Sequence, residues 1–203
     1  LGGTASGSGT VGTAGTVTLT ATGAVGDNSA AGSVLSDKLL VSAGNSASLT
    51  STSNDVVTVA ASITGSGQSF TYKDATGVAI GTVGATNGIT TKGGTVTVST
   101  VTGDITSVSG KNITTSAGTN TGTVSGAVTL TTAAGNITLG GDIVTTGGTR
   151  STASSGTASA GGQVDVTANG GTLTVANITT SGGAHTGGAA GDNGGNAAAI
   201  NLT

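Results

Sequence analysis

The sequence predicts an all-β protein folded as a parallel β-helix (β-solenoid), with about six coils of three short strands and Gly-rich loops at one corner. Three observations predict this class. Val, Ile and Thr alternate with polar residues, similar runs recur along the chain, and Gly occupies 40 of the 203 positions. Because only 6% of the residues are charged and Pro is absent, the composition differs from that of disordered chains, which are rich in charge and Pro.

The first strand of each repeat is an alternating run with two inward apolar positions, as in Thr-Val-Thr-Val-Ser at 95–99. The first inward position is expected at Val17, Ala47, Phe70, Val96, Val128, Val164 and Ile200. The second is expected at Leu19, Leu49, Tyr72, Val98, Leu130, Val166 and Leu202. Since the two sets keep one register, they predict two columns of core residues.

The second and third strands follow each first strand at short intervals. A second apolar run is expected to start at Val25, Val56, Val78, Ile105, Ile137 and Leu173. A third element recurs nearly unchanged as Gly88-Ile89-Thr90-Thr91, Asn112-Ile113-Thr114-Thr115, Ile143-Val144-Thr145-Thr146 and Asn177-Ile178-Thr179-Thr180. Gly, Asn and Asp lie between the elements and favour turns. Each repeat alone could not bury its apolar side, so stacked coils are expected to share one core.

The division of the chain follows the loops. Residues 1–15 are expected to be the tail of a Gly-rich loop, and 16–203 a single segment with irregular coils at 16–94 and regular repeats at 95–203. Insertions at 118–126, 147–162 and 182–195 should project from one corner of the stack. The chain begins at Leu1 and contains no Met, so it is expected to be a processed product or part of a longer array.

Several partner classes are excluded by composition. A formal net charge of −3 lacks the basic footprint of nucleic-acid binding. No apolar run approaches the roughly 18 residues needed to span a bilayer, so no membrane insertion is expected. The absence of Cys excludes a disulfide scaffold.

No catalytic or cofactor-binding residue is expected. His185 is the only His and lies in a Gly-rich loop with no partner group held nearby. Asp55, Asp104 and Asn136 should share one corner, where a ladder of turn residues explains them better than a carboxylate pair. The candidate Ca²⁺ ligands are Asp192, Asn193 and Asn196, which offer oxygen atoms in a Gly-rich turn. Because the motif does not recur in every coil, no metal is expected there.

The outward positions of the first strands predict two columns of mostly Thr and Ser. One is Thr18, Ser48, Thr71, Thr97, Thr129, Asp165 and Asn201, and the other is Thr20, Thr50, Lys73, Ser99, Thr131, Thr167 and Thr203. Such an array resembles the surface of β-solenoid ice-binding proteins. Lys73, Asp165 and Asn201 interrupt it, and Thr is simply favourable on the outward side of strands.

The repeats resemble those of a known family. Asn-Ile-Thr-Thr-Ser-Gly-Gly at 177–183, the Gly/Ala-rich loops, and Gly-Gly-x-Val-x-Val-Thr-Ala at 161–168 resemble the shaft of filamentous-haemagglutinin-like bacterial adhesins. The likeness covers 88–203 well and 1–87 loosely. It implies a right-handed parallel β-helix, secretion across an outer membrane, and adhesion or a matrix role. The Asn-Pro motif of the family's secretion domain has no counterpart, because Pro is absent.

These observations predict a non-catalytic structural shaft of an extracellular bacterial adhesin or fibre. The chain is expected at the cell surface, self-associating into filaments or bundles by end-to-end stacking, with host or matrix glycans as a further class of partner. The alternative is a binding module that uses the Thr-rich face or the Gly-rich loops to contact ice or glycan.

Overall fold

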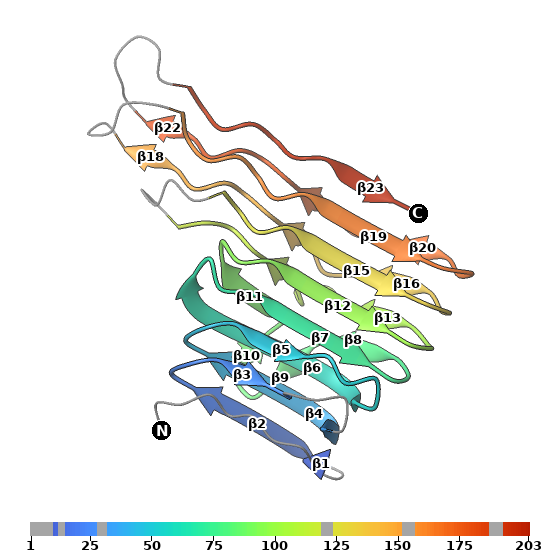
Figure 1. Cartoon of the computed structure of the whole chain (residues 1–203). Helices are drawn as coiled ribbons and strands as arrows, with labels where there is room; N and C mark the ends of the chain where they lie inside the picture. Colours follow the sequence, from blue (N-terminus) through green and yellow to red (C-terminus); the bar gives the residue numbers. More distant parts are fainter. Residues whose placement is uncertain (1–9, 12–14, 28–31, 119–123, 152–156, 187–192) are drawn as a thin grey trace.

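The computed structural model describes residues 10–11, 15–27, 32–118, 124–151, 157–186 and 193–203. Within these ranges the regular structure is β throughout and no helix is present. The strands stack along one long axis, with the N-terminal strands at one end and the C-terminal strands at the other (Figure 1). The all-β class and the long parallel sheets predicted from the sequence are confirmed.

One sheet has seven parallel strands. They are β3 (Val25–Gly26), β5 (Ala47–Leu49), β7 (Phe70–Asp74), β12 (Val96–Thr100), β15 (Val128–Thr132), β19 (Val164–Ala168) and β23 (Ile200–Leu202). Each strand pairs with the next in this order, so the sheet extends from β3 at one end to β23 at the other.

The second sheet has twelve strands. They are β1 (Thr10–Val11), β2 (Thr16–Ala21), β4 (Ser33–Ala43), β6 (Asp55–Ser66), β8 (Val78–Ile80), β11 (Ile89–Lys92), β13 (Ile105–Ser107), β14 (Ile113–Thr114), β16 (Ile137–Leu139), β17 (Ile143–Val144), β20 (Leu173–Thr174) and β21 (Ile178–Thr179). Strands β1 and β2 both pair with β4, and β4 pairs with β6. From β6 the sheet divides into two branches, β8-β13-β16-β20 and β11-β14-β17-β21.

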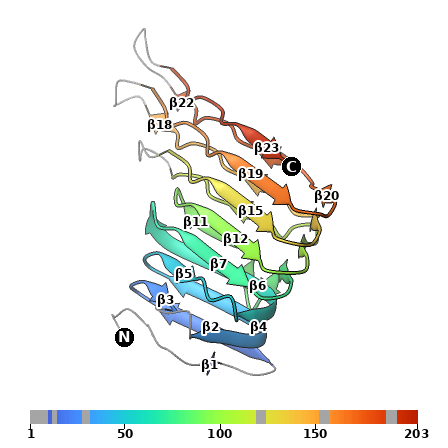
Figure 2. The same ribbon diagram turned by 45° about the vertical axis from the view of Figure 1, so that its right-hand side comes forward.

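The chain visits the two sheets in turn, and we call one trip through the twelve-stranded sheet and then the seven-stranded sheet a passage. The strands of successive passages lie one above another (Figure 2). The inward side chains therefore form columns along the axis. Val96, Val128 and Val164 are in register and fully buried, as are Ile105 and Ile137. The core is one continuous cluster of such residues.

The third strands follow the prediction closely. Ile89 pairs with Ile113, Ile113 with Ile143, and Ile143 with Ile178, as the recurring Ile-Thr element indicates. The first-strand column is confirmed from Ala47 to Ile200.

The assignment of the first passage was wrong. Val17 and Leu19 do not lie in the column of Ala47; they belong to β2, where Val17 pairs with Leu39 and Leu19 with Val41. Val25, expected to start a second strand, takes the place beside Ala47. Thr18 and Thr20 are therefore not part of the predicted outward columns. The residue aligned with Ser48 in the first of these columns is Gly26. The physical reason is that alternation has the same period in either sheet, so it cannot tell which sheet a run joins.

The early passages also differ from the expected three short strands. Strands β4 and β6 have 11 and 12 residues, and each takes the place of the second and third short strands of a later passage. Val59 of β6 pairs with Ile80 of β8, and Ala61 of the same strand pairs with Ile89 of β11. Val56, expected to align with Val78, instead pairs with Ser36 of β4. Within the stretch expected to be loop tail, Thr10–Val11 forms β1.

A hairpin unforeseen from the sequence interrupts the fourth passage. Strands β9 (Thr82–Val83) and β10 (Thr86–Asn87) pair antiparallel around Gly84, whose φ is +60°. The hairpin packs against β4 and β6. Val83 and Ala60 are both buried outside the main core cluster, so the hairpin covers outward-facing apolar side chains of the twelve-stranded sheet.

The described parts of the last two insertions lie side by side, as the spacing predicts. Strands β18 (Arg150–Ser151) and β22 (His185–Thr186) come from two successive insertions and pair in parallel (Figure 1). Their loops stack through backbone hydrogen bonds such as Gly183 N to Ser159 O at 2.8 Å. A Cβ on Gly183 would overlap the carbonyl of Gly148, so the small residues allow the close approach.

Candidate functional site

The candidate site is the set of polar side chains that follow the corners of the stack. At the corner between the seven-stranded sheet and the next passage, Asp104 Oδ1 accepts a hydrogen bond from Asn136 N at 2.7 Å. Asn136 Oδ1 in turn accepts from Thr172 N at 2.8 Å and from its hydroxyl at 2.9 Å. Asp55 accepts from the hydroxyl of Thr76 at 2.9 Å. The expected ladder of turn residues is therefore confirmed for Asp104 and Asn136 and continues to Thr172, whereas Asp55 bonds to Thr76.

A second ladder follows the corner between the two branches of the twelve-stranded sheet. Asn112 Oδ1 accepts from Asp142 N at 2.9 Å, and Asp142 Oδ1 accepts from Asn177 N and Nδ2 at 3.3 and 3.1 Å. Each carbonyl or carboxylate oxygen thus satisfies a backbone N–H of the following passage. The chemistry of this column is hydrogen bonding along the axis, with its polar atoms engaged in holding turns.

A third column consists of buried Thr hydroxyls at the base of the corner insertions. The donors are Thr91, Thr115, Thr145 and Thr180, which donate to the carbonyls of Gly94, Gly126, Gly162 and Ala198 at 2.6, 2.5, 2.6 and 2.8 Å. Each bond joins the end of the third strand to the residue that leads back into the seven-stranded sheet. The hydroxyl closes the base of the insertion whatever its length. The recurrent Thr-Thr doublet was a partial sequence signal, since the donor is the second Thr of 90–91, 114–115 and 179–180 but the first of 145–146.

We expect Thr145→Val to lower the free energy of unfolding by about 1–3 kcal/mol, because the change keeps the shape but leaves the buried Gly162 carbonyl with a lost hydrogen bond. Urea denaturation followed by circular dichroism measures the change. Thr114→Val is the matched control, since Thr114 is half-buried and its partner one passage further is already Val144. A control loss equal to that of Thr145→Val would contradict the closing role of the hydroxyl.

The structure also places a buried carboxyl that sequence reasoning missed. Asp74 and Tyr72 are fully buried, and the Tyr72 hydroxyl donates to Asp74 Oδ2 at 2.5 Å. Asp74 also accepts from Val56 N and Thr76 N, both at 3.0 Å. In the next passages the aligned residues are Thr100 and Thr132. Asp74 thus occupies a corner position that carries a hydroxyl in the next two passages and Ala168 in the third.

Burial dominates the electrostatics of this pair. Desolvation raises the pKa of Asp74 above its usual range, and the charge of Asp55 adds to this, although the hydrogen bonds from Tyr72, Thr76 and Val56 act in the opposite direction. Burial likewise raises the pKa of Tyr72, with further contributions from the charge and the hydrogen bond of Asp74. The Tyr72 hydroxyl therefore remains a donor.

We expect Asp74→Asn to flatten part of the pH dependence of stability. Because the pKa of Asp74 is higher in the folded state, its contribution to stability is fully present below the unfolded value of 3.8 and is lost as pH rises through the folded pKa. The unfolding free energy of the unmodified protein, measured relative to the Asn variant in urea, should thus fall with rising pH in this window. Parallel profiles for the unmodified protein and Asp74→Asn would contradict the assignment.

The described residues cover only part of the set of calcium candidates. Asp192 lies outside the described residues. The carbonyls of Asn193 and Asn196 accept backbone hydrogen bonds from Ala158 and Gly161, both at 2.9 Å. No group of three or more His, Cys, Asp or Glu side chains that could hold a metal ion is found among the residues described.

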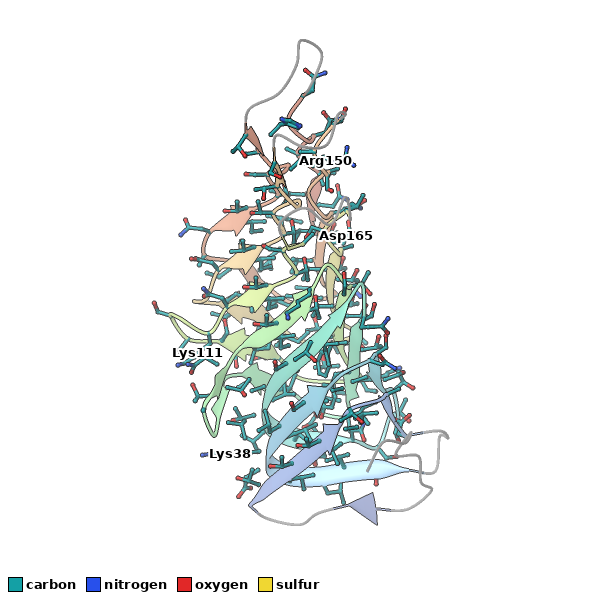
Figure 3. All side chains as sticks on the ribbon, turned by 90° about the vertical axis from the view of Figure 1, so that its left-hand side faces the viewer. Lys38, Lys111, Arg150 and Asp165 are labelled. Atoms are coloured by element: carbon teal, nitrogen blue, oxygen red, sulfur yellow. The ribbon has the colours of Figure 1, made fainter. Side chains whose placement is uncertain are left out.

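His185 is more ordered than the sequence suggests. It lies half-buried in β22 and pairs with Arg150 of β18, where a solvated loop residue was expected. Lys38 lies toward the N-terminal end of the stack and Lys111 near its middle, whereas Arg150 and Asp165 both lie toward the C-terminal end (Figure 3). Lys111 Nζ donates to Asn87 Oδ1 of the hairpin at 3.0 Å.

The outward face of the seven-stranded sheet has its two columns in register. Thr71, Thr97, Thr129, Asp165 and Asn201 align in one, and Lys73, Ser99, Thr131 and Thr167 in the other. In strand β15 both outward positions, Thr129 and Thr131, are occupied by Thr. Asp165 also accepts from Gln163 at 2.8 Å and from Asn201 at 2.6 Å.

The described residues include no helix with the length and hydropathy needed to cross a membrane. Comparison of the chain with protein families, with curated proteins and with solved structures finds no match.

Proposed function

We propose that the chain is a parallel β-solenoid that forms the structural shaft of an extracellular bacterial adhesin or fibre. In this proposal each passage is one coil, and the coil repeats along the axis of the shaft. The observation that carries the proposal is the engagement of the polar side chains: the corner ladders from Asp104 and Asn112 and the buried Thr hydroxyls hold one passage to the next or close its loops. Such side chains support a structural role.

The continuity of the core supports the same role. Columns such as Val96, Val128 and Val164 run through successive passages in direct register and are fully buried. A stack built this way lengthens by adding passages, and its stability is close to a sum of nearest-neighbour terms. These are the properties required of a shaft that holds another element away from a surface.

Immunogold labelling of intact source cells with antibodies raised against the chain tests this function. The proposal expects gold on the outer surface or along filaments that extend from it. Gold confined to the interior of sectioned cells, with intact cells unlabelled, would overturn the extracellular role.

A second candidate function is a binding module, which the in-register hydroxyl columns of the seven-stranded sheet support. Ice or a glycan would contact the face around Thr129 and Thr131. Shaping of growing ice crystals by the unmodified chain, lost in Thr131→Lys, would favour this candidate over the shaft. Normal crystal growth in both would exclude ice as the ligand.

A further inference from the structure

The hairpin of β9 and β10 ends in an Asn-Gly pair whose side-chain carbonyl is held by two donors. Asn87 is the last residue of β10 and is exposed, and Gly88 follows it. Asn87 Oδ1 accepts a hydrogen bond from the Thr82 hydroxyl at 2.6 Å and another from Lys111 Nζ at 3.0 Å. Thr82 belongs to the same hairpin, whereas Lys111 comes from the next passage. An amide of the hairpin therefore lies directly beside an amine of the next passage.

The register of the strands supports this contact. Ile89 of β11 pairs with Ile113 of β14, and Ile89 N donates to Asn112 O at 3.0 Å. Asn87 and Lys111 each precede these paired isoleucines by two residues, so they occupy corresponding places in successive passages. Lys111 lies near the middle of the stack (Figure 3). The contact between the amide and the amine thus follows from backbone pairing as well as from the two side chains.

The fold requires glycine after Asn87. Gly88 has a φ of +67°, and a Cβ there would overlap the backbone carbonyl of Asn112. Glycine is also the residue that least obstructs attack of its own backbone nitrogen on the preceding Asn side chain, because it has no side chain itself. That attack closes a five-membered cyclic imide. The structure therefore places the residue pair that forms this imide most readily next to a lysine.

The two donors favour the same reaction. When a nitrogen attacks Cγ of Asn87, negative charge develops on Oδ1, and hydrogen-bond donors already aimed at this oxygen stabilise that charge. The Lys111 ammonium and the Thr82 hydroxyl occupy these donor positions. Gly88 N donates to Gly81 O at 2.8 Å. This bond must open before the Gly88 nitrogen attacks, which makes imide formation slow.

We propose that Asn87 and Lys111 form a covalent amide cross-link between the hairpin and the next passage. In the first step Gly88 N bonds to Cγ of Asn87, the bond from Cγ to Nδ2 breaks, and ammonia leaves with the proton of the Gly88 amide. In the second step the neutral Nζ of Lys111 attacks the same Cγ, the bond to Gly88 N breaks, and this nitrogen takes a proton from the attacking amine. The net change is the loss of one ammonia molecule, and no oxidant or further reactant is needed.

Water competes with Lys111 in the second step, since hydrolysis of the imide gives aspartate or isoaspartate at position 87. Lys111 Nζ starts within hydrogen-bond distance of the Asn87 carbonyl. An amine held beside the reacting carbon acts like a very high local concentration of free amine. We therefore expect attack by Lys111 to exceed hydrolysis in the folded chain. This cross-link is independent of the proposed shaft function.

Peptide mass spectrometry after trypsin digestion tests the cross-link. The unmodified chain is first incubated at about pH 9, where a larger fraction of lysine is neutral than at pH 7. Without the cross-link, Asn87 lies in peptide 74–92 and Lys111 ends peptide 93–111. With it, trypsin cannot cut after Lys111, so 74–92 appears joined to 93–150 with the mass of one ammonia missing. An imide without a cross-link loses the same mass but leaves peptide 74–92 on its own.

Lys111→Arg is the matched control, because Arg keeps a cationic donor at Asn87 Oδ1 but its guanidinium stays charged and cannot open the imide. This variant should give no joined peptide and should instead carry aspartate or isoaspartate at position 87. Incubation of the unmodified chain in urea is the second control. Since the two residues are 24 apart in the sequence, unfolding should lower the yield of joined peptide at least about tenfold.

A joined peptide from the folded, unmodified chain, absent in Lys111→Arg, would support the cross-link. Peptide 74–92 that stays unchanged, or that is converted only to the imide or to its hydrolysis products, would overturn it. Equal yields of joined peptide in urea and in the folded chain would also overturn it, because the reaction would then owe nothing to the contact in the structure.

Discussion

Replacement of Leu130 by Asp should unfold the protein or lower its free energy of unfolding by about 4 kcal/mol or more. Leu130 is fully buried, and its column neighbours Val98 and Val166 are fully buried as well. A carboxylate there would have apolar neighbours on both sides and no cationic partner. The loss of stability should extend to the passages on either side, because each passage is stabilised mainly by its two neighbours.

Thr131→Asp is the matched control, one residue further along the same strand. Thr131 lies on the outward side between Ser99 and Thr167, with no carboxylate directly beside it in the column. Its substitution should change stability by about 0.5 kcal/mol or less. Guanidinium denaturation followed by circular dichroism measures both variants, and losses of similar size would show that the inward and outward faces of β15 are wrongly assigned.

How far the fold could be predicted depended on the kind of signal. Val96, Val128 and Val164 were placed correctly because both their alternation and their spacing recur. Val17 was misplaced because alternation alone fits either sheet. The spacing between repeats favours Val25 instead. Val25 precedes Ala47 by 22 residues, close to the 23 residues from Ala47 to Phe70, whereas Val17 precedes Ala47 by 30.

The elements that sequence reasoning missed are those that depend on tertiary contacts. The hairpin at 81–88 packs against β6, a strand of an earlier passage, and Val83 of the hairpin and Ala60 of β6 are both buried outside the main core cluster. Asp74 is an ordinary turn residue in sequence, and its burial follows from the Tyr72 hydroxyl and the Val56 amide that reach it. The corner ladder through Asp104 and Asn136 was predictable because it repeats locally in each turn.

Replacement of Gly126 by Ala should be nearly as damaging as a charge in the core, with an expected loss of about 3 kcal/mol or more. Gly94, Gly126 and Gly162 stack at the entrance to the seven-stranded sheet. A Cβ on Gly126 would overlap the carbonyl of Gly94, and a Cβ on Gly162 would overlap that of Gly126. The obstacle is backbone, so it cannot move by changing a rotamer.

The loss at Gly126 should include its hydrogen bond, because the Gly126 carbonyl accepts from the buried Thr115 hydroxyl. Gly26→Ala is the control: Gly26 lies in β3 and a Cβ there meets only ordinary contact at 3.6 Å. It should be neutral or stabilising by up to about 1 kcal/mol, since Ala restricts the unfolded chain. Thermal unfolding of both variants by circular dichroism tests the pair. A Gly126→Ala protein as stable as Gly26→Ala would mean that successive passages are not packed backbone to backbone at this corner.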